Sequence, residues 1–275
     1  MGTLTVSSDD RFDQPSTSEP TLPKILVFHK VTPQFSYGST NYSPRRLCRL
    51  LSVLQERGYR FESLENTLTG ADPFSIAITF DDGYQHLADI LPKLIDRFHL
   101  QPVVFVPTRY IGRPNNWDYS CLFRTESHLD VGIIKVLARQ GVEFGSHGHS
   151  HINLCRCDAK VRRGEIQRSK EMLQDLLGAE IRYISYPFGR YNEEVMQDTQ
   201  EIGYTRGLTM SFPDRGDMAL STGRFCVYGY DTTASVRRKL TGGPLYRFEK
   251  WKADFSNRLS AGTELYRRLF GKRRG

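Results

Sequence analysis

The chain has 275 residues, of which 39% are hydrophobic and 25% are charged. These values exclude a fibrous or wholly disordered protein and fit a globular chain that buries a core, with one domain as the default. The net charge of +7 is uneven, because residues 235–275 hold twelve Lys or Arg against three Asp or Glu, a local +9 that leaves the rest of the chain at −2.

Residues 1–22 are expected to form a disordered N-terminal arm. This stretch is rich in Ser, Thr, Asp and Pro and lacks the basic start and apolar segment of a signal peptide. No later window reaches the roughly 18 uninterrupted apolar residues that span a bilayer. The five cysteines are irregularly spaced, which fits a reducing compartment better than a disulfide framework. We therefore expect a cytoplasmic protein.

Residues 23–234 alternate short β-rich apolar runs with stretches of helical periodicity, which predicts an α/β domain with βα units around a parallel sheet. The predicted strands are, in chain order, Ile25–Phe28, Ile76–Phe80, Val103–Val106, Val142–Gly145, Tyr183–Tyr186 and Thr205–Thr209. The predicted helices include Pro44–Arg57, His86–Phe98, Val131–Arg139 and Lys160–Leu177.

Residues 235–275 are predicted to form a basic amphipathic C-terminal segment. Apolar side chains recur there at nearly helical spacing, with Lys and Arg between them: Leu245, Phe248, Trp251, Phe255, Leu259, Tyr266 and Leu269. Two interpretations stay open: the apolar stripe packs on the α/β domain, or it binds an anionic membrane surface. We expect no nucleic-acid partner, because no recognised nucleic-acid module accompanies the charge.

Ionisable side chains follow several predicted strands at the point where each strand ends. His29 follows the first strand, Asp81 and Asp82 follow the second, and His147 and His151 follow the fourth. Because the carboxyl ends of parallel strands converge on one face of a barrel, these distant residues can share one pocket.

The histidine cluster is the more specific of the two chemical signals. Asp81-Asp82-Gly83 alone is ordinary turn chemistry. By contrast, three of the seven histidines lie between positions 147 and 151, and neutral imidazole is the commonest protein ligand for a catalytic transition metal. Spacing leaves open whether His147 binds together with His149 or with His151. Two histidines and one carboxylate would leave metal positions for water and substrate, as hydrolysis requires.

Together the two segments resemble the polysaccharide deacetylase family, the family 4 carbohydrate esterases. Residues 79–83 match the family's T-F-D-D-G motif completely, and residues 147–151 match its H-[ST]-x-x-H motif except that Gly148 replaces the hydroxyl residue. The resemblance implies a distorted (β/α) barrel with fewer than eight strands.

The resemblance also implies a role for each motif residue. Asp81 would be the general base, and Asp82, His147 and His151 would bind one divalent metal. Zinc is the default, with nickel, cobalt, manganese or iron as alternatives, since this ligand set accepts all of them.

The third family motif, an R-x-P-[YF]-G pattern, is incomplete in this chain. Residues 185–189 read Ser-Tyr-Pro-Phe-Gly, so the arginine that would orient the catalytic carboxylate is missing. Arg224 and Arg190 are the candidates to supply that charge.

The same motif implies part of the substrate site. By resemblance, the N–H of Phe188 is the candidate oxyanion donor, with Pro187 and Tyr186 beside it. Trp117 lies in the long connection after the third predicted strand and could wall the site, because sugar rings stack on indole faces; a loop anchor is an equal interpretation.

The commoner members of the family supply the general acid from a late histidine, and this chain has none after His151. Either the chain is inactive, or the acid comes from another segment. The run Phe28-His29-Lys30-Val31 resembles the Y-H-x-V start of a branch of the family, including exopolysaccharide deacetylases, in which the catalytic histidine lies on the N-terminal strand. This resemblance implies that His29 protonates the leaving amine.

These residues predict metal-dependent hydrolysis of the N-acetyl amide of an amino sugar in a polysaccharide or lipid-linked glycan, with release of acetate. The basic tail would place such an enzyme peripherally at the inner membrane face. Two alternatives stay open: a non-catalytic glycan-binding or scaffold protein of the same fold, and a deformylase or amidase that acts on another amide.

Overall fold

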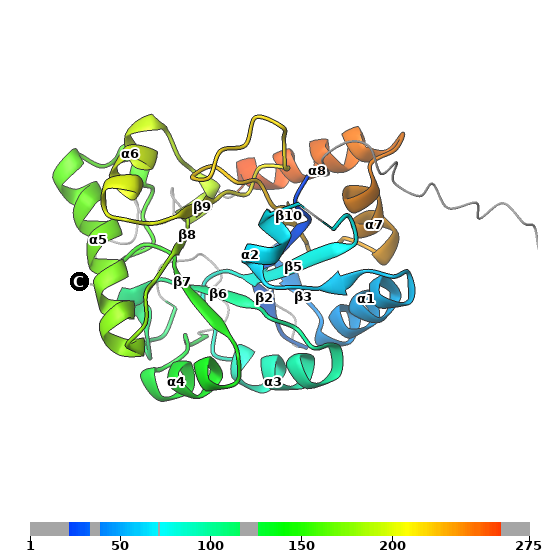
Figure 1. Ribbon diagram of the computed structural model, residues 1–275, viewed down its shortest axis with the longest axis horizontal. Coiled ribbons are helices and arrows are strands. Elements are labelled where there is room, and N and C mark those ends of the chain that lie inside the picture. Colours follow the sequence, from blue (N-terminus) through cyan, green and yellow to red (C-terminus); the bar gives the residue numbers. More distant parts are fainter. Residues whose placement is uncertain (1–21, 34–38, 71, 116–125, 260–275) are drawn as a thin grey trace, which may run out of the picture.

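The apolar runs of the sequence form one parallel β-sheet that curls into an incomplete barrel (Figure 1). The structure, a computed structural model, describes residues 22–33, 39–70, 72–115 and 126–259. Seven strands follow one another around the sheet: β10 (Phe225–Cys226), β1 (Ile25–Phe28), β5 (Ser75–Phe80), β6 (Val103–Val106), β7 (Glu143–Ser146), β8 (Tyr183–Ser185) and β9 (Arg206–Leu208). Strands β1, β5 and β6 are buried along their whole length, as expected of parallel strands covered by helices.

The two ends of the sheet approach each other near β9. A parallel bridge between Leu208 and Thr222 links β9 to the chain just before β10. β4 (Arg60–Phe61) pairs with the first residues of β5, off the seven-strand path, and β2 (Lys30–Val31) pairs with β3 (Asn41–Tyr42) in a separate small sheet. The predicted distorted (β/α) barrel with fewer than eight strands is therefore confirmed.

Helices pack around the outside of this barrel (Figure 1). They are α1 (Pro44–Glu56), α2 (Leu64–Leu68), α3 (Leu87–Phe98), α4 (Val131–Arg139), α5 (Ala159–Leu177), α6 (Glu193–Glu201), α7 (Thr233–Thr241) and α8 (Tyr246–Leu259). Three 3₁₀ turns, η1 (Thr108–Tyr110), η3 (Leu154–Arg156) and η4 (Pro187–Gly189), follow strands. Helix α1 shows why they form: it buries leucines at positions 47, 50, 51 and 54, the spacing of one helical face.

Local signals set the helix ends. The side chain of Asp158 accepts the N–H of Val161 at the start of α5, and Gly178 ends the helix with a φ of 63°, the left-handed conformation that glycine adopts without strain. The sequence interpretation missed β10 and α6, because a two-residue strand shows no periodicity and α6 has only a weak apolar pattern.

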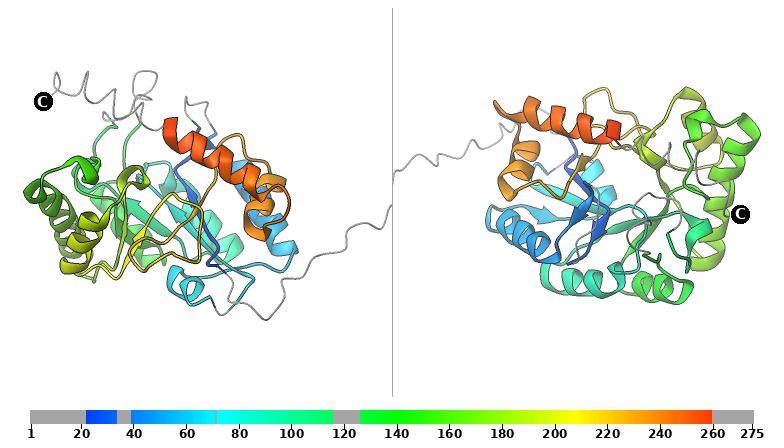
Figure 2. Two further views of the ribbon diagram at one scale, coloured as in Figure 1. Left: turned by 90° about the horizontal axis from the view of Figure 1, so that it is seen from above. Right: turned by 180° about the vertical axis from the view of Figure 1, so that it is seen from behind.

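The C-terminal helices pack beside the barrel (Figure 2). The boundary expected at residue 234 falls inside α7, which contacts α1 and α8. Most of the predicted N-terminal arm (residues 1–21) and the end of the basic segment (residues 260–275) lie outside the described residues, so the proposed division of the chain stays a prediction. In the described part of the chain, none of the helices has the length and apolar character needed to cross a membrane.

Candidate active site

The carboxyl ends of β1 and β5 bring His29 and Asp81 to the same level of the barrel. The two strands pair with Phe28 opposite Phe80, and the N–H of Asp81 donates a 2.9 Å hydrogen bond to the carbonyl of Phe28. Since neighbouring strands lie about 4.8 Å apart, the residues that follow these strands are neighbours in space.

The chain turns sharply after Asp81. Asp82 has a φ of 68°, a left-handed conformation that costs a non-glycine residue about 1–3 kcal/mol. His128 stabilises this turn, because its Nδ1 donates a 2.7 Å hydrogen bond to the carbonyl of Asp82 while its ring stacks on Tyr84 with a centroid distance of 5.1 Å. His151 also has a positive φ, of 51°. Backbone strain of this kind is concentrated at functional sites.

Asp82, His147 and His151 converge on one point. The Nε2 atoms of both histidines lie 3.5 Å from Oδ1 of Asp82, the three candidate ligand atoms lie within 4.8 Å of one another, and all three residues are buried. Nδ1 of His149 instead contacts the hydroxyl of Thr108 at 2.9 Å. The donor set of two imidazoles and one carboxylate fits a divalent transition metal with open coordination positions.

His147, the first of the two histidines that are candidate metal ligands, has a defined tautomer. Nδ1 of His147 donates a 2.7 Å hydrogen bond to the carbonyl of Ser185, which leaves Nε2 on the side of Asp82 as the ligand atom. Although burial lowers the pKa of His147, the charges of Asp81 and Asp82 outweigh burial and raise it. The ring is therefore held among carboxylates in a fixed orientation.

The loop that carries the second histidine is tied to α5. Glu165 accepts hydrogen bonds from the N–H of Ser150 at 2.7 Å and from its hydroxyl at 2.6 Å. Gly148 has a φ of 72°, and a Cβ added there would lie 3.4 Å from Cγ of Pro187. This conformation gives a physical reason for glycine where the family motif has a hydroxyl residue.

Arg224 holds the carboxylate of Asp81 from a distant segment. The arginine is fully buried and donates from Nη1 to Oδ1 at 2.9 Å and from Nη2 to Oδ2 at 2.8 Å. The hydroxyl of Ser185 also donates to Oδ2, at 2.9 Å, and accepts from Arg224 at 2.7 Å. Ser185 occupies the motif position of the family's arginine, so the charge missing from β8 is supplied just before β10.

Both carboxylates are ionised at neutral pH. Burial raises the pKa of Asp81, but the charge of Arg224 and then that of His147 outweigh burial and lower the pKa to about 2. Burial also raises the pKa of Asp82, but the hydrogen bond with His147 and the charge of His151 hold it well below its usual range. A metal ligand and a general base both need this charged form.

His29 is 9% exposed, and its Nδ1 is buried without a hydrogen-bond partner in the residues that the structure describes. Burial lowers the pKa of His29, while the charges of Asp82 and Asp81 act in the opposite direction. A protonated ring in this place is a stronger acid than ordinary imidazolium, which suits proton donation to an amine.

The remaining predicted site residues lie in different environments. Phe188 has a φ of 60° and places its ring 4.7 Å from that of His151, and Pro187 precedes it beside Gly148. Tyr186 is fully buried and its hydroxyl donates to the carbonyl of Leu220 at 2.9 Å, so its side chain lies in the core behind the site. Arg190 is exposed at the end of η4. Trp117 lies outside the described residues.

Three residues that contact the site had no role in the sequence interpretation. Ser185 occupies the position of the motif arginine that orients the catalytic carboxylate, so the motif could have indicated that Ser185 contacts Asp81. His128 and Glu165 act across 46 and 15 residues of chain, and no local pattern signals such contacts.

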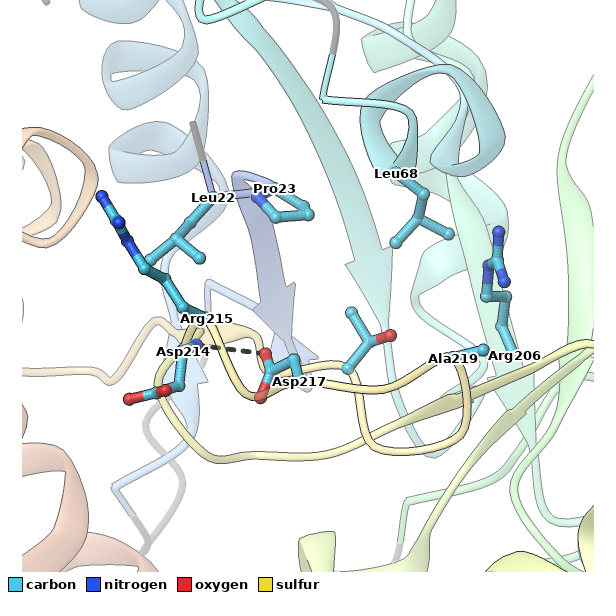
Figure 3. Close-up of a pocket in the computed structure, with 9 residues that line it drawn as sticks. Leu22, Pro23, Leu68, Arg206, Asp214, Arg215, Asp217 and Ala219 are labelled. Atoms are coloured by element: carbon cyan, nitrogen blue, oxygen red, sulfur yellow. Dashed lines mark hydrogen bonds between the residues drawn. The ribbon is translucent and has the colours of Figure 1, made fainter. Parts of the chain in front are cut away.

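A cavity of about 440 Å³ opens at the other end of the barrel, where the strands begin (Figure 3). Its lining consists of Leu22, Pro23, Leu68, Arg206, Asp214, Arg215, Asp217, Ala219 and Thr222. Asp217 accepts hydrogen bonds from the N–H groups of Asp214 and Gly223 at 3.2 and 2.8 Å. These contacts stabilise a loop, and the cavity includes none of the site residues.

The family model described as polysaccharide deacetylase matches residues 70–207, which is half of the chain. The match includes the two carboxylates and the histidine cluster but neither His29 nor Arg224. The contact of Arg224 with Asp81 therefore rests on the structure, and the acid role of His29 stays a prediction.

Individual relatives agree with the family model. YxkH of Bacillus subtilis, whose name assigns it to the polysaccharide deacetylases, is 26% identical over 208 residues, or 73% of this chain and 69% of YxkH. The peptidoglycan-N-acetylglucosamine deacetylase of Bacillus cereus is 26% identical over 131 residues, or 47% of this chain and 42% of that protein. The solved structure of the Streptococcus pyogenes deacetylase PplD in complex with acetate has a TM-score of 0.70 and 19% identity, covering 82% of this chain and 100% of that chain. The similarity to PplD shows that the two chains share a fold.

Proposed function

The chain belongs to the polysaccharide deacetylase family, and from this premise we propose that it hydrolyses the N-acetyl amide of an amino sugar in a polysaccharide or lipid-linked glycan. The observation that carries the proposal is the buried Asp82, His147 and His151 cluster with the ionised Asp81 directly beside it. The relative named for peptidoglycan-N-acetylglucosamine supports an acetylated amino sugar as the substrate class.

Asp81 is the proposed general base. A divalent metal held by Asp82, His147 and His151 would acidify a water molecule and polarise the acetyl carbonyl; zinc is the default. Asp81 takes one proton from the attacking water. Since its low pKa makes it a weak base, its contribution is position: Arg224 and Ser185 fix both carboxylate oxygens before substrate arrives.

His29 is the proposed general acid. Attack of water forms the new C–O bond, and cleavage of the C–N bond requires a proton on the amine nitrogen. His29, beside Asp81 at the end of β1, donates that proton, so that acetate and a free amine leave. The N–H of Phe188 is the proposed donor to the developing oxyanion.

The test is acetate release from N-acetylglucosamine oligomers by protein loaded in turn with zinc, nickel, cobalt or manganese. We expect metal-dependent release, and we expect Asp81→Asn and His29→Ala each to lower kcat by about 10²–10⁴-fold with unchanged metal content, because neither residue is a ligand. Asp82→Asn should lose the metal itself. His99→Asn is the matched control, since His99 lies exposed at the end of α3.

Two other outcomes would redirect the proposal. Binding of metal and oligomer without acetate release from any substrate would indicate a non-catalytic glycan-binding protein. Formate release from N-formyl amides without acetate release would indicate a deformylase.

A further inference from the structure

An exposed row of apolar side chains runs along α8. Phe248, Trp251 and Phe255 are 51%, 59% and 53% exposed, and Leu245 just before the helix is 51% exposed. The ring centroids of Phe248 and Trp251 are 6.0 Å apart, as are those of Trp251 and Phe255. Single exposed apolar residues are ordinary, but a contiguous row of large ones marks an interaction surface.

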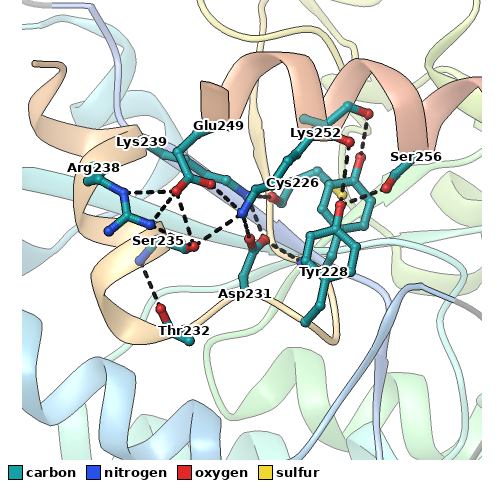
Figure 4. A network of polar contacts seen from close by, with 12 residues as sticks. Cys226, Tyr228, Asp231, Thr232, Ser235, Arg238, Lys239, Glu249, Lys252 and Ser256 are labelled. Carbon is teal, nitrogen blue, oxygen red and sulfur yellow. Dashed lines mark hydrogen bonds and ion pairs between the residues drawn. The ribbon is translucent and has the colours of Figure 1, made fainter. Parts of the chain in front are cut away.

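The opposite face of α8 faces the protein and is largely polar (Figure 4), with Tyr246 and Ala253 as its apolar contacts with the core. Glu249 is fully buried, with Nε of Arg238 at 2.8 Å and Nζ of Lys252 at 2.6 Å from its carboxylate. About two turns after Glu249, Ser256 contacts the hydroxyl of Tyr230 at 2.6 Å, and Asn257 accepts from the hydroxyl of Tyr228 at 2.7 Å. An ordinary surface helix buries its large apolar side chains and exposes its polar ones, whereas α8 exposes three large aromatic side chains and buries Glu249.

This inverted packing keeps the aromatic row outside. Rolling α8 to bury Trp251 would break the ion pairs of Glu249 with Arg238 and Lys252 and the hydrogen bonds of Ser256 and Asn257, which is unfavourable. Over the described residues, these contacts favour an exposed apolar row over one that packs on the barrel.

The positive charge around the apolar row of α8 indicates which class of partner would bind there. Arg247 and Lys250 flank the row and are exposed, and residues 235–275 carry twelve basic against three acidic residues. A second copy of this chain would bring the same positive charge against itself, and a neutral glycan would gain little from it. Anionic lipid headgroups are attracted by such a segment, and Trp and Phe beside Lys and Arg suit the bilayer interface.

We propose that α8 is a docking surface for an anionic lipid bilayer, with Phe248, Trp251 and Phe255 inserted at the interface and Arg247 and Lys250 on the headgroups. The proposal goes beyond the proposed hydrolysis and does not depend on it. A chain docked in this way would meet glycans that are attached to the same surface.

The two tryptophans of the chain allow a direct test. Trp117→Phe leaves Trp251 as the sole tryptophan of the full chain. We expect its emission to shift to shorter wavelength and to be quenched by brominated lipid when vesicles contain phosphatidylglycerol. Vesicles of pure phosphatidylcholine should have little effect, and added salt should weaken the binding, because it screens the charges.

Substitutions separate the aromatic row from charge alone. Phe248→Ser combined with Phe255→Ser should lower the apparent affinity for the anionic vesicles by about tenfold or more, because two buried aromatic groups are lost from the interface. The matched control combines Val136→Ser with Met218→Ser, residues that are 50% and 57% exposed away from α8. Both variants should keep the parent's circular dichroism and melting temperature.

Absence of vesicle binding, or equal binding by the aromatic and control variants, would overturn the proposal. An emission shift of Trp251 with N-acetylglucosamine oligomers, or with protein concentration in the absence of vesicles, would also overturn it. Those outcomes would assign the row to a glycan or to a second copy of the chain.

Discussion

Asp81 and Arg224 form a fully buried ion pair between residues 143 positions apart in the chain. Two charges are expensive to remove from water, and they persist in a core only when geometry and additional hydrogen bonds compensate. Here the contact is bidentate. The hydroxyl of Ser185 also donates to the carboxylate of Asp81, and the carbonyl of Thr209 accepts from Nε of Arg224. At the scale of the residue, Arg224 is the largest of the influences that keep the carboxylate of Asp81 charged against burial.

Replacing Arg224 should change both stability and the pH dependence of activity. In Arg224→Met, Asp81 loses the largest of the charges that oppose burial, so the pKa of Asp81 should rise from about 2. Because the base works only when ionised, activity should then fall as pH decreases through this higher pKa. We also expect a loss of about 3–5 kcal/mol in unfolding free energy, as when one partner of a buried pair is removed.

A pH–rate profile and urea unfolding measure these two effects. Arg224→Lys should fall between the wild type and Arg224→Met, because it keeps the charge but not the bidentate geometry. Arg139→Met, on the exposed side of α4, is the control for loss of an arginine. An unchanged acid limb in Arg224→Met would show that Asp81 is not held in this way.

At the scale of the element, the loop between β7 and α5 determines where His151 points. The loop combines a glycine with positive φ, a strained His151 and the hydrogen bonds of Ser150 to Glu165. A short loop with these constraints has little freedom left, so its ligand is held in place before any metal binds.

Gly148→Ser would restore the hydroxyl of the family motif, and we expect it to be harmful in this chain. A side chain at a φ of 72° is strained, although its Cβ would make only an ordinary contact, 3.4 Å from Cγ of Pro187. The expected cost is about 1 kcal/mol of stability and about a tenfold loss of zinc affinity through the displaced loop. Thermal unfolding and competition with a zinc chelator measure the two effects.

Gly164→Ala in α5 is the matched control for that substitution. Gly164 has open space around its Cβ position, and alanine in a helix is more favourable than glycine by about 0.5–1 kcal/mol. The control should therefore gain stability without a change in zinc affinity. Equal behaviour of the two variants would argue against a strained loop.

At the scale of the whole molecule, a buried polar network joins the C-terminal helices to the barrel (Figure 4). Lys239 of α7 donates to the carbonyl of Cys226 in β10 at 2.8 Å and pairs with Asp231 at 2.5 Å. Lys252 of α8 pairs with both Asp231 and Glu249. The last two helices are thus joined to the barrel by ion pairs as well as by buried Val236, Leu240 and Ala253, while Phe248, Trp251 and Phe255 of α8 stay exposed.

Glu249→Gln should loosen α8 without unfolding the barrel. Its partners Arg238 and Lys252 are 35% and 20% exposed, so solvent reduces the expected loss to about 1–3 kcal/mol. Hydrogen exchange should accelerate in residues 246–257 and stay slow in β1 and β5. Asp254→Asn on the same helix, where the side chain is partly exposed, is the control, and uniform acceleration across the whole chain would contradict a local role.

The sequence by itself determined the barrel, the family and the candidate ligands. Alternating apolar runs and helical periods are local properties, and they predicted six of the seven strands of the barrel path to within a residue, together with the fold class that is confirmed. The two aspartates and the histidine cluster are short motifs, so resemblance could assign Asp82, His147 and His151. Metal dependence and the acid role of His29 stay predictions.

Only the tertiary structure decided which distant groups complete the site and which way α8 faces. Sequence left Arg224 and Arg190 as equal candidates, because nothing local tells which arginine lies beside Asp81 after folding. The contacts of His128 and Glu165 likewise exist only once separate segments pack together. The periodicity of α8 showed an apolar stripe but not its direction, since the direction depends on the ion pairs of the buried Glu249 with Arg238 of α7 and Lys252 of α8.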